Sequence, residues 1–117
     1  MIWLLLEYEL VLTDFLNRHG NDALLGRLAR LEELGNLLRA PASELLDDGI
    51  FELRANSKEG QLRIYYFFGP DVQQITIVHA VVKKRRKADP SDIKLAKRRR
   101  STIARNQVRL NRYVVGN

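Results

Sequence analysis

The chain has 117 residues, which is enough for one domain with a single modest core. Hydrophobic residues make up 45% of it and charged residues 29%, a composition that argues against a chain disordered throughout. It contains no cysteine, which excludes a disulfide framework and any thiolate metal site. We therefore expect a single domain over residues 1–117 that works in a reducing cytoplasm.

Positive charge is concentrated in the last third of the chain. Residues 1–82 carry 7 Lys and Arg against 12 Asp and Glu, whereas residues 83–117 carry 13 against 2. This asymmetry indicates either an anionic partner of the C-terminal third, most often nucleic acid or an acidic protein, or a basic surface tail. A solvated helix face is the commoner explanation of a charge run in general, and it stays open here.

The N-terminal segment MIWLLLEYELVL is apolar and partly alternating, which predicts a first strand within residues 3–11. No basic residue precedes it, and Glu7 and Glu9 interrupt it after six apolar residues. That run is too short for a signal peptide or a membrane span. We therefore expect no membrane partner.

Two helices are predicted next. The first is short and starts at Thr13, whose hydroxyl can cap it. The second covers residues 22–34, because its leucines recur at intervals of three and four residues. Asn21 or Asp22 can cap its start, and Gly35 stands where a left-handed C-terminal cap belongs. Together they form a helical hairpin.

Three strand-like runs follow, over residues 50–55, 61–68 and 73–82. Short turns separate them, so they are expected to be antiparallel neighbours. Alternation in the middle run gives one face that we assign to the core and an opposite, open face. The core face carries Leu62, Ile64, Tyr66 and Phe68, and the open face carries Arg63, Tyr65 and Phe67.

Neighbouring segments supply more polar groups to this arrangement. Glu52 and Arg54 share one face of the first run, so Arg54 can stand beside Arg63 across the sheet. Asp89 and Pro90 then predict the start of a last helix, which carries an apolar stripe and a basic side.

The strands and their exit gather the candidate catalytic side chains, which are Arg54, Arg63, Tyr65, His79, Lys83 and Lys84. His79 shares a face with Ile75 and Ile77 under strict alternation, so it is either a core histidine or a functional one. The cations at the strand exit can also be a solvated edge that blocks unwanted strand pairing.

Several chemistries are set aside. The two histidines have no ligand spacing between them, so we expect no metal. No glycine-rich phosphate loop is present, and we expect no cofactor. Asp47 and Asp48 precede a glycine and are interpreted as turn residues.

Three segments in order, GIFELR, LRIYYFF and ITIVHAVVKKRRKADPSDIKLAKRRR, resemble the RelE/ParE superfamily of toxins from toxin–antitoxin systems, and in particular its phage-derived, HigB-like branch. The resemblance runs from about residue 49 to residue 100, and the helical hairpin upstream of it lies where the family has one. It implies an α+β fold of order β-α-α-β-β-β-α, with a small antiparallel-rich sheet and helices packed on one face. It also implies a basic concave surface on the other face.

The resemblance also implies a function, which is metal-independent cleavage of messenger RNA on the ribosome. Expected partners are the ribosome with its mRNA and a cognate antitoxin of helix-turn-helix, HigA-like type. Arg54 and Arg63 would hold the phosphorane, and Lys83 or Lys84 would be the base, with a pKa lowered by the neighbouring cations. Tyr65 would stack on a base or help in proton transfer, and His79 would be the alternative acid. The RNA-contacting and ribosome-contacting set would be Arg85, Arg86, Lys87, Lys97, Arg98, Arg99 and Arg100.

Some points stay open at this stage. Members of this group often place an acid–base residue near the C-terminus, where this chain offers Tyr113. A ParE-like gyrase inhibitor that cleaves nothing is one alternative function. A non-toxic basic nucleic-acid-binding module is another.

Overall fold

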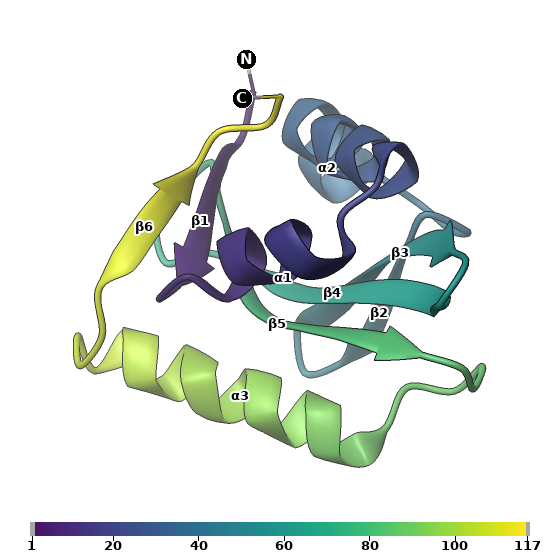
Figure 1. Ribbon diagram of the computed structural model, residues 1–117. Coiled ribbons are helices and arrows are strands. Elements are labelled where there is room, and N and C mark those ends of the chain that lie inside the picture. The colour runs from purple at the N-terminus through teal and green to yellow at the C-terminus, as the bar shows by residue number, and fades with distance from the viewer. Residues whose placement is uncertain (1, 117) are drawn as a thin grey trace.

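The computed structural model describes residues 2–116 (Figure 1). The elements, in chain order, are β1 (Leu4–Tyr8), α1 (Val11–His19), α2 (Asp22–Leu34), a 3-10 turn (Gly35–Leu37), β2 (Ser43–Asp47), β3 (Ile50–Ser57), β4 (Gly60–Phe68), β5 (Gln74–Lys83), α3 (Pro90–Ala104) and β6 (Leu110–Tyr113). The fold is α+β, as predicted. None of the helices within residues 2–116 combines the length and the apolar character needed to cross a membrane.

Six strands form one mixed sheet, in the order β2-β3-β4-β5-β1-β6. The predicted antiparallel neighbours β3, β4 and β5 are confirmed, and β1 joins them by parallel pairing with β5. Two strands were not predicted: β2 pairs with β3 at one edge, and β6 pairs with β1 at the other. Both are short segments without a clear apolar alternation, so their sequences give little signal.

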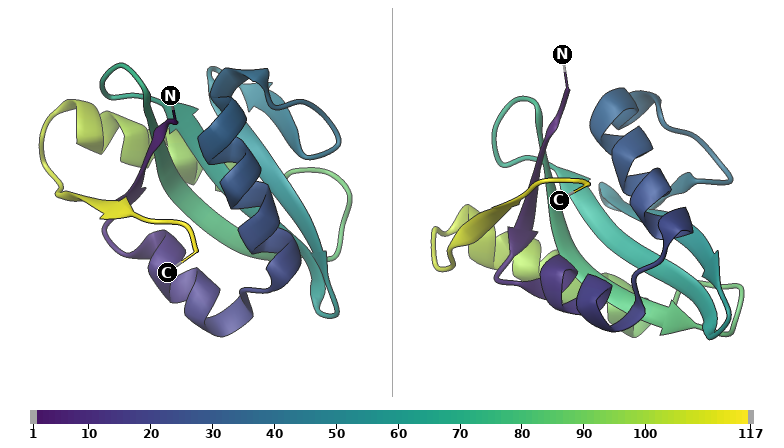
Figure 2. Two further views of the ribbon diagram at one scale, coloured as in Figure 1. Left: turned by 90° about the horizontal axis from the view of Figure 1, so that it is seen from above. Right: turned by 45° about the horizontal axis from the view of Figure 1, so that its top comes forward.

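The expectation that the helices pack on one face is wrong, because they cover both faces of the sheet (Figures 1 and 2). Helices α1 and α2 bury Leu12, Phe15, Leu24 and Leu28 against one face. On the other face, α3 buries Ala96 and Ile103 in a second cluster, which includes Ile50, Tyr65, Phe67 and Val78 from the strands. The second face therefore carries enough apolar area to require a cover of its own.

Strand β5 contains an irregularity opposite the middle of β4. Tyr65 pairs with His79, whereas the next residue, Tyr66, pairs with Ile77, so Val78 is an extra residue on β5. Such a β-bulge breaks the two-residue alternation of side chains. Val78 accordingly packs in the α3 cluster, whereas Ile77 packs in the α1–α2 cluster.

The bulge changes the side to which His79 points. His79 contacts Asp92 of α3 with Nε2 at 2.8 Å from the carboxylate, on the opposite face from Ile75 and Ile77. The expectation that His79 shares a face with these isoleucines is therefore wrong. The extra residue in β5 carries the imidazole to the side of the sheet where Arg63 and Tyr65 lie.

Helix α1 begins at Val11, two residues before the predicted cap at Thr13. Its first amides are capped from β1: the carboxylate of Glu7 accepts hydrogen bonds from the backbone N–H of Leu12 at 2.9 Å and of Thr13 at 2.8 Å. The Thr13 hydroxyl donates to the same carboxylate at 2.6 Å. For α2, the predicted cap at Asn21 is confirmed, since its side chain accepts from the Leu24 amide at 2.8 Å.

Candidate functional site

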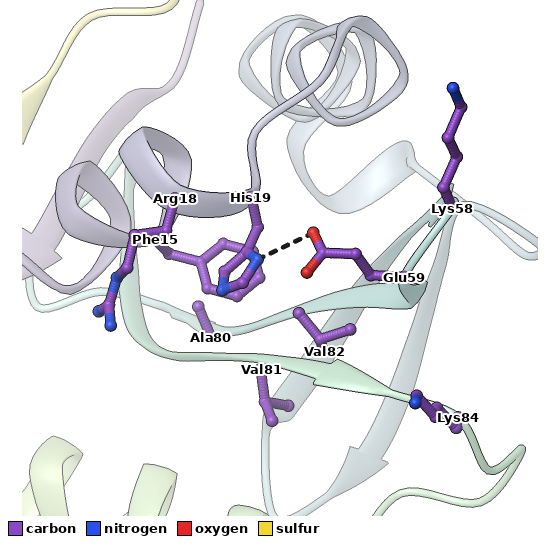
Figure 3. A pocket seen from close by; sticks show the side chains of 9 residues that line it. All are labelled: Phe15, Arg18, His19, Lys58, Glu59, Ala80, Val81, Val82 and Lys84. Carbon is purple, nitrogen blue, oxygen red and sulfur yellow. Dashed lines mark hydrogen bonds and ion pairs between the residues drawn. The ribbon is translucent and has the colours of Figure 1, made fainter.

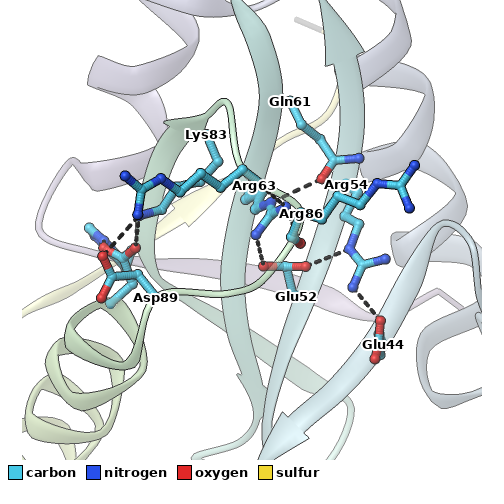
Figure 4. Close-up of polar contacts among 11 residues, drawn as sticks. Glu44, Glu52, Arg54, Gln61, Arg63, Lys83, Arg86 and Asp89 are labelled. Carbon is cyan, nitrogen blue, oxygen red and sulfur yellow. Dashed lines mark hydrogen bonds and ion pairs between the residues drawn. The ribbon is translucent and has the colours of Figure 1, made fainter.

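Two rows of polar side chains lie on the face of the sheet toward α3, one across β3, β4 and β5 and the other across β3 and β4. Figure 4 shows Glu52, Arg54 and Arg63 of these rows. In the first row, Glu52, Tyr65 and His79 stand directly opposite one another on the three strands. In the second row, Arg54 stands opposite Arg63, as the alternation predicted. The candidate residues of these strands are therefore neighbours in space, and Glu52 joins them.

Glu52 is fully buried and lies between the two arginines. Its carboxylate accepts a hydrogen bond from Arg54 Nε at 2.5 Å and lies 3.5 Å from Arg63 Nη1. Arg54 also forms an ion pair with Glu44 of β2. Burial lowers the pKa of Arg54, but the hydrogen bonds and charges of Glu52 and Glu44 outweigh it and raise the pKa overall.

Arg63 is also buried, with 1% of its side chain exposed. Its Nε donates to Gln61 at 2.9 Å, and its Nη2 donates to the backbone carbonyls of Arg85 at 2.6 Å and Arg86 at 2.5 Å. The guanidinium therefore anchors the segment that follows β5. In this conformation it is covered by that segment and does not face solvent.

Tyr65 places its hydroxyl in the same buried cluster. Within residues 2–116 this hydroxyl has no hydrogen-bond partner, and the same is true of Glu52 Oε2 and Arg63 Nη1. Burial raises the pKa of Tyr65 strongly, and the negative charges of Glu52 and Asp92 raise it further. The phenol is therefore protonated at neutral pH and available as a donor.

The start of α3 closes the site on the side of β5. The Asp92 carboxylate contacts two residues of β5. Its Oδ1 lies 2.8 Å from His79 Nε2, and its Oδ2 lies 2.7 Å from Lys83 Nζ. Lys83 also lies 3.4 Å from Asp89, the residue that caps α3. The hydrogen bond to Asp92 raises the pKa of Lys83 against an opposing effect of burial. The expectation that neighbouring cations lower the pKa of Lys83 is therefore wrong.

The residues that follow β5 form the exposed part of the site. Lys84, Arg85, Arg86 and Lys87, which we call the basic segment, are all exposed. Their side chains make no hydrogen bond or ion pair with the described part of the chain. These four cations are thus free to meet an anionic partner.

The cations of α3 differ from this segment, because most of them bind the protein itself. Lys97 pairs with Asp47, and Arg100 pairs with the Asp48 carboxylate at 2.8 Å. Arg99 donates to the carbonyl of Val78, the bulge residue, at 2.7 Å, and its guanidinium lies 4.9 Å from the centre of the Tyr8 ring. Arg98 is exposed, and in residues 2–116 its side chain has no charged partner.

Sequence reasoning missed the acids that organise these cations. Glu52 was placed on the same strand face as Arg54 without a role, although a carboxylate two residues from an arginine on one strand face is a signal for an ion pair. Asp92 lies in the first turn of α3, and its contact with β5 depends on the bulge, which no pattern announces. Tyr113 does not join the site: it pairs with Leu5 at the far side of the sheet and packs against the α1–α2 core.

A family model described as "Phage derived protein Gp49-like (DUF891)" matches residues 14–101. That range runs from α1 into α3 and contains both polar rows and the basic segment. No curated protein matches the chain. Among the described residues, no group of three or more His, Cys, Asp or Glu side chains could hold a metal ion.

Proposed function

The chain belongs to the phage-derived Gp49-like family, a RelE/toxin-like family, and from this membership we propose that it is the toxin of a type II toxin–antitoxin system that cleaves messenger RNA on the ribosome. A HigB-like toxin of this kind needs no metal. The observation that carries the proposal is the convergence of Arg54, Arg63, Tyr65, His79 and Lys83 on one face of the sheet, beneath four free cations.

The proposed reaction is an internal transesterification. The RNA 2′-oxygen attacks the adjacent phosphorus while its proton passes to a base, and the bond from phosphorus to the 5′-oxygen breaks. The products are a 2′,3′-cyclic phosphate and a 5′-hydroxyl, whose proton comes from an acid. Both proton transfers are internal to the enzyme and the RNA, so no further reactant is required.

The site suggests which group performs each step. His79 is the better base, because the contact between Asp92 and Nε2 leaves Nδ1 as the acceptor when the imidazole is neutral. Lys83 is the acid, since its raised pKa keeps it protonated at neutral pH. Arg54, Arg63 and the Tyr65 hydroxyl would stabilise the charge of the phosphorane. Lys84 stays an alternative base from the edge of the site.

Access to these groups requires movement of the basic segment. The backbone carbonyls of Arg85 and Arg86 accept hydrogen bonds from Arg63 Nη2, so the phosphate must displace them to reach this guanidinium. The four cations of the basic segment would hold RNA phosphates while the segment moves, and the α3 surface around Arg98 would contact ribosomal RNA. Both contacts would weaken with salt.

A cleavage assay in a translating extract tests the proposal. We expect a 2′-deoxy substitution at the scissile nucleotide to abolish cleavage with little effect on binding, because the nucleophile is then missing. EDTA should leave the rate unchanged once the ribosomes are supplied with excess Mg²⁺. The product ends, read by their reactivity with a kinase and a ligase, should be a 5′-hydroxyl and a cyclic phosphate. Cleavage of the deoxy-substituted message at the same bond would contradict the mechanism.

The burial of Arg63 favours a second candidate, a ParE-like toxin that inhibits DNA gyrase without cleaving anything. In that case the arginines and acids only shape the surface. Inhibition of gyrase supercoiling together with intact message would establish this function instead. A non-toxic binding module would do neither, and its induced expression would not arrest growth.

A cognate antitoxin is part of the proposal. A helix-turn-helix, HigA-like protein would inhibit by covering the basic segment or by blocking access to the ribosome. Co-expression of the neighbouring gene should then restore growth. Failure of that gene product to bind the chain in a pull-down would remove the toxin–antitoxin assignment.

A further inference from the structure

A pocket outside the polar rows lies on the opposite side of β5, between the end of α1 and the turn from β3 to β4 (Figure 3). Its volume is about 620 Å³. Phe15 and Ala80 lie at its centre, and the cations Arg18, Lys58 and Lys84 stand around its edge. The pocket therefore combines an apolar floor with a cationic border.

This pocket continues into a second one, of about 360 Å³, around the β3–β4 turn. The two share Lys58, Glu59 and Lys84 as lining residues. The second pocket is also lined by Arg85 and Arg86 of the basic segment. We call the two adjoining pockets together the turn groove; their lining residues extend from Phe15 and Arg18 of α1 to Arg85 and Arg86, whose carbonyls cover Arg63.

The turn groove has a strong excess of positive charge. Among its described lining residues, Glu59 is the one acid, and it lies 3.1 Å from His19. Arg63 and Lys83 also line the groove, but Arg63 is engaged by Glu52 and Lys83 by Asp92 of α3. Five more cations form no ion pair within residues 2–116, namely Arg18, Lys58, Lys84, Arg85 and Arg86.

We propose that the turn groove binds the backbone of single-stranded RNA as it leaves the reaction centre, an inference that rests on the function proposed above. The five cations without an ion pair are distributed over the linings of both pockets, as a chain of phosphates requires, whereas a compact anion would need cations that converge on one point. The groove ends at the carbonyls that cover Arg63, so a strand bound in it leads directly to the site. The apolar floor offers a surface for a base between two phosphates.

Binding of uncleavable RNA tests the path. The probes are 2′-O-methyl oligoribonucleotides of two lengths, a trinucleotide and a nonanucleotide, titrated against wild type, Lys58→Glu and Arg86→Glu at several salt concentrations. Lys58 stands on an exposed turn, so its charge can be reversed without disturbing the core. Arg30→Glu is the matched control, because Arg30 is an exposed cation on α2 that does not line the groove.

We expect Lys58→Glu to weaken binding of the nonanucleotide and to reduce the slope of log K against log salt by about 0.7 or more, the value for one lost phosphate contact on a single strand. The trinucleotide should bind the wild type and Lys58→Glu equally, since it is too short to extend from the basic segment to Lys58. Arg86→Glu should weaken both probes, and Arg30→Glu neither. Equal thermal midpoints of the variants would show that the folds are intact.

The outcomes separate the inference from the function on which it rests. Normal binding of the nonanucleotide by Lys58→Glu, with weak binding by Arg86→Glu, would overturn the path but leave the RNA-directed function in place. Absence of salt-dependent RNA binding by every protein, wild type included, would overturn both. If Lys58→Glu instead binds RNA normally and loses affinity for a polyglutamate peptide, the groove is a site for an acidic protein and the inference is wrong.

Discussion

Glu52 and Arg63 are two charged residues placed where water scarcely reaches. Removing such groups from water is costly, and their mutual attraction offsets that cost only while both partners are present. Here the two lie 3.5 Å apart, and Arg63 gains three further hydrogen bonds from Gln61 and the basic segment. Arg63 is therefore part of the framework of the site, whatever it also does in the reaction.

Truncation of Arg63 should therefore lower the stability of the fold, independently of any role in the reaction. We expect Arg63→Ala to lower the free energy of unfolding by up to about 3–5 kcal/mol, because it leaves the buried Glu52 carboxylate with Arg54 as its one remaining cation. The double variant Glu52→Gln, Arg63→Gln should lose clearly less, since no uncompensated charge remains. Urea unfolding at neutral pH measures both. An Arg63→Ala protein as stable as the wild type would show that the pair is energetically irrelevant.

Asp89 gives a test in the acid range. Hydrogen bonds from the backbone and side chain of Ser91, and then from Lys83, lower the pKa of Asp89 from 3.8 to about 2. A carboxyl whose pKa is lower in the folded chain stabilises the fold above its unfolded pKa, and this contribution is lost as the pH falls toward the folded pKa. Thermal midpoints should therefore decline between pH 3.8 and about 2 in part through Asp89.

Asp89→Asn isolates this contribution. Asparagine caps a helix about as well as aspartate but does not titrate, so the variant should keep α3 and show a shallower decline of the thermal midpoint in the same pH range. The comparison with wild type removes the effect of the other carboxyls. Parallel acid curves for the two proteins would contradict the assignment.

At the scale of elements, the basic residues of α3 fall into two groups, those that contact the protein itself and those that face solvent. Arg100 and Lys97 fasten the β2–β3 turn through Asp48 and Asp47, and Arg99 binds the bulge carbonyl of β5. Arg98 points to solvent. The run of four cations is thus largely a set of structural contacts, which the sequence alone could not distinguish from a nucleic-acid-binding face.

A pair of variants separates these two groups. Arg98→Ala should leave the unfolding free energy unchanged and weaken ribosome association at low salt, because it removes a free cation. Arg100→Ala should lower the unfolding free energy by up to about 1 kcal/mol, the range for a partly exposed ion pair. Urea unfolding and ribosome co-sedimentation give the two measurements. If Arg98→Ala sediments with ribosomes as the wild type does, the α3 surface takes no part in binding.

Some elements were predictable and others were not, for physical reasons that differ. The meander β3–β4–β5 follows from its turns and alternation, and α2 follows from its leucine spacing and from Asn21. The cap of α1 could not be predicted from the sequence, because Glu7 belongs to the strand that precedes the helix and so lies outside any local capping pattern. The bulge at Val78 could not be predicted either, since it is set by packing on both faces of β5.

For the whole molecule, the alternation correctly placed Arg54 beside Arg63, and the basic residues mark the region of the candidate site. What the sequence could not give is which cations are free. That depends on the acids that fold back onto them, and Asp92, Asp47 and Asp48 meet their partners only through the position of α3. The placement of α3 on the second face was missed because Tyr65 and Phe67 were assigned to an open surface, whereas both are buried.

The parallel pairing of β1 with β5 has a consequence for how the protein is made. Strand β1 is synthesised first, yet both of its neighbours, β5 and β6, come late in the chain, as the registers of Leu4 with Gln74 and of Leu5 with Tyr113 show. Contacts between such distant segments close large loops and form slowly. A nascent chain therefore exposes the apolar strand β1 unpaired until β5 has been synthesised, and the sheet is completed only after β6 has left the ribosome tunnel.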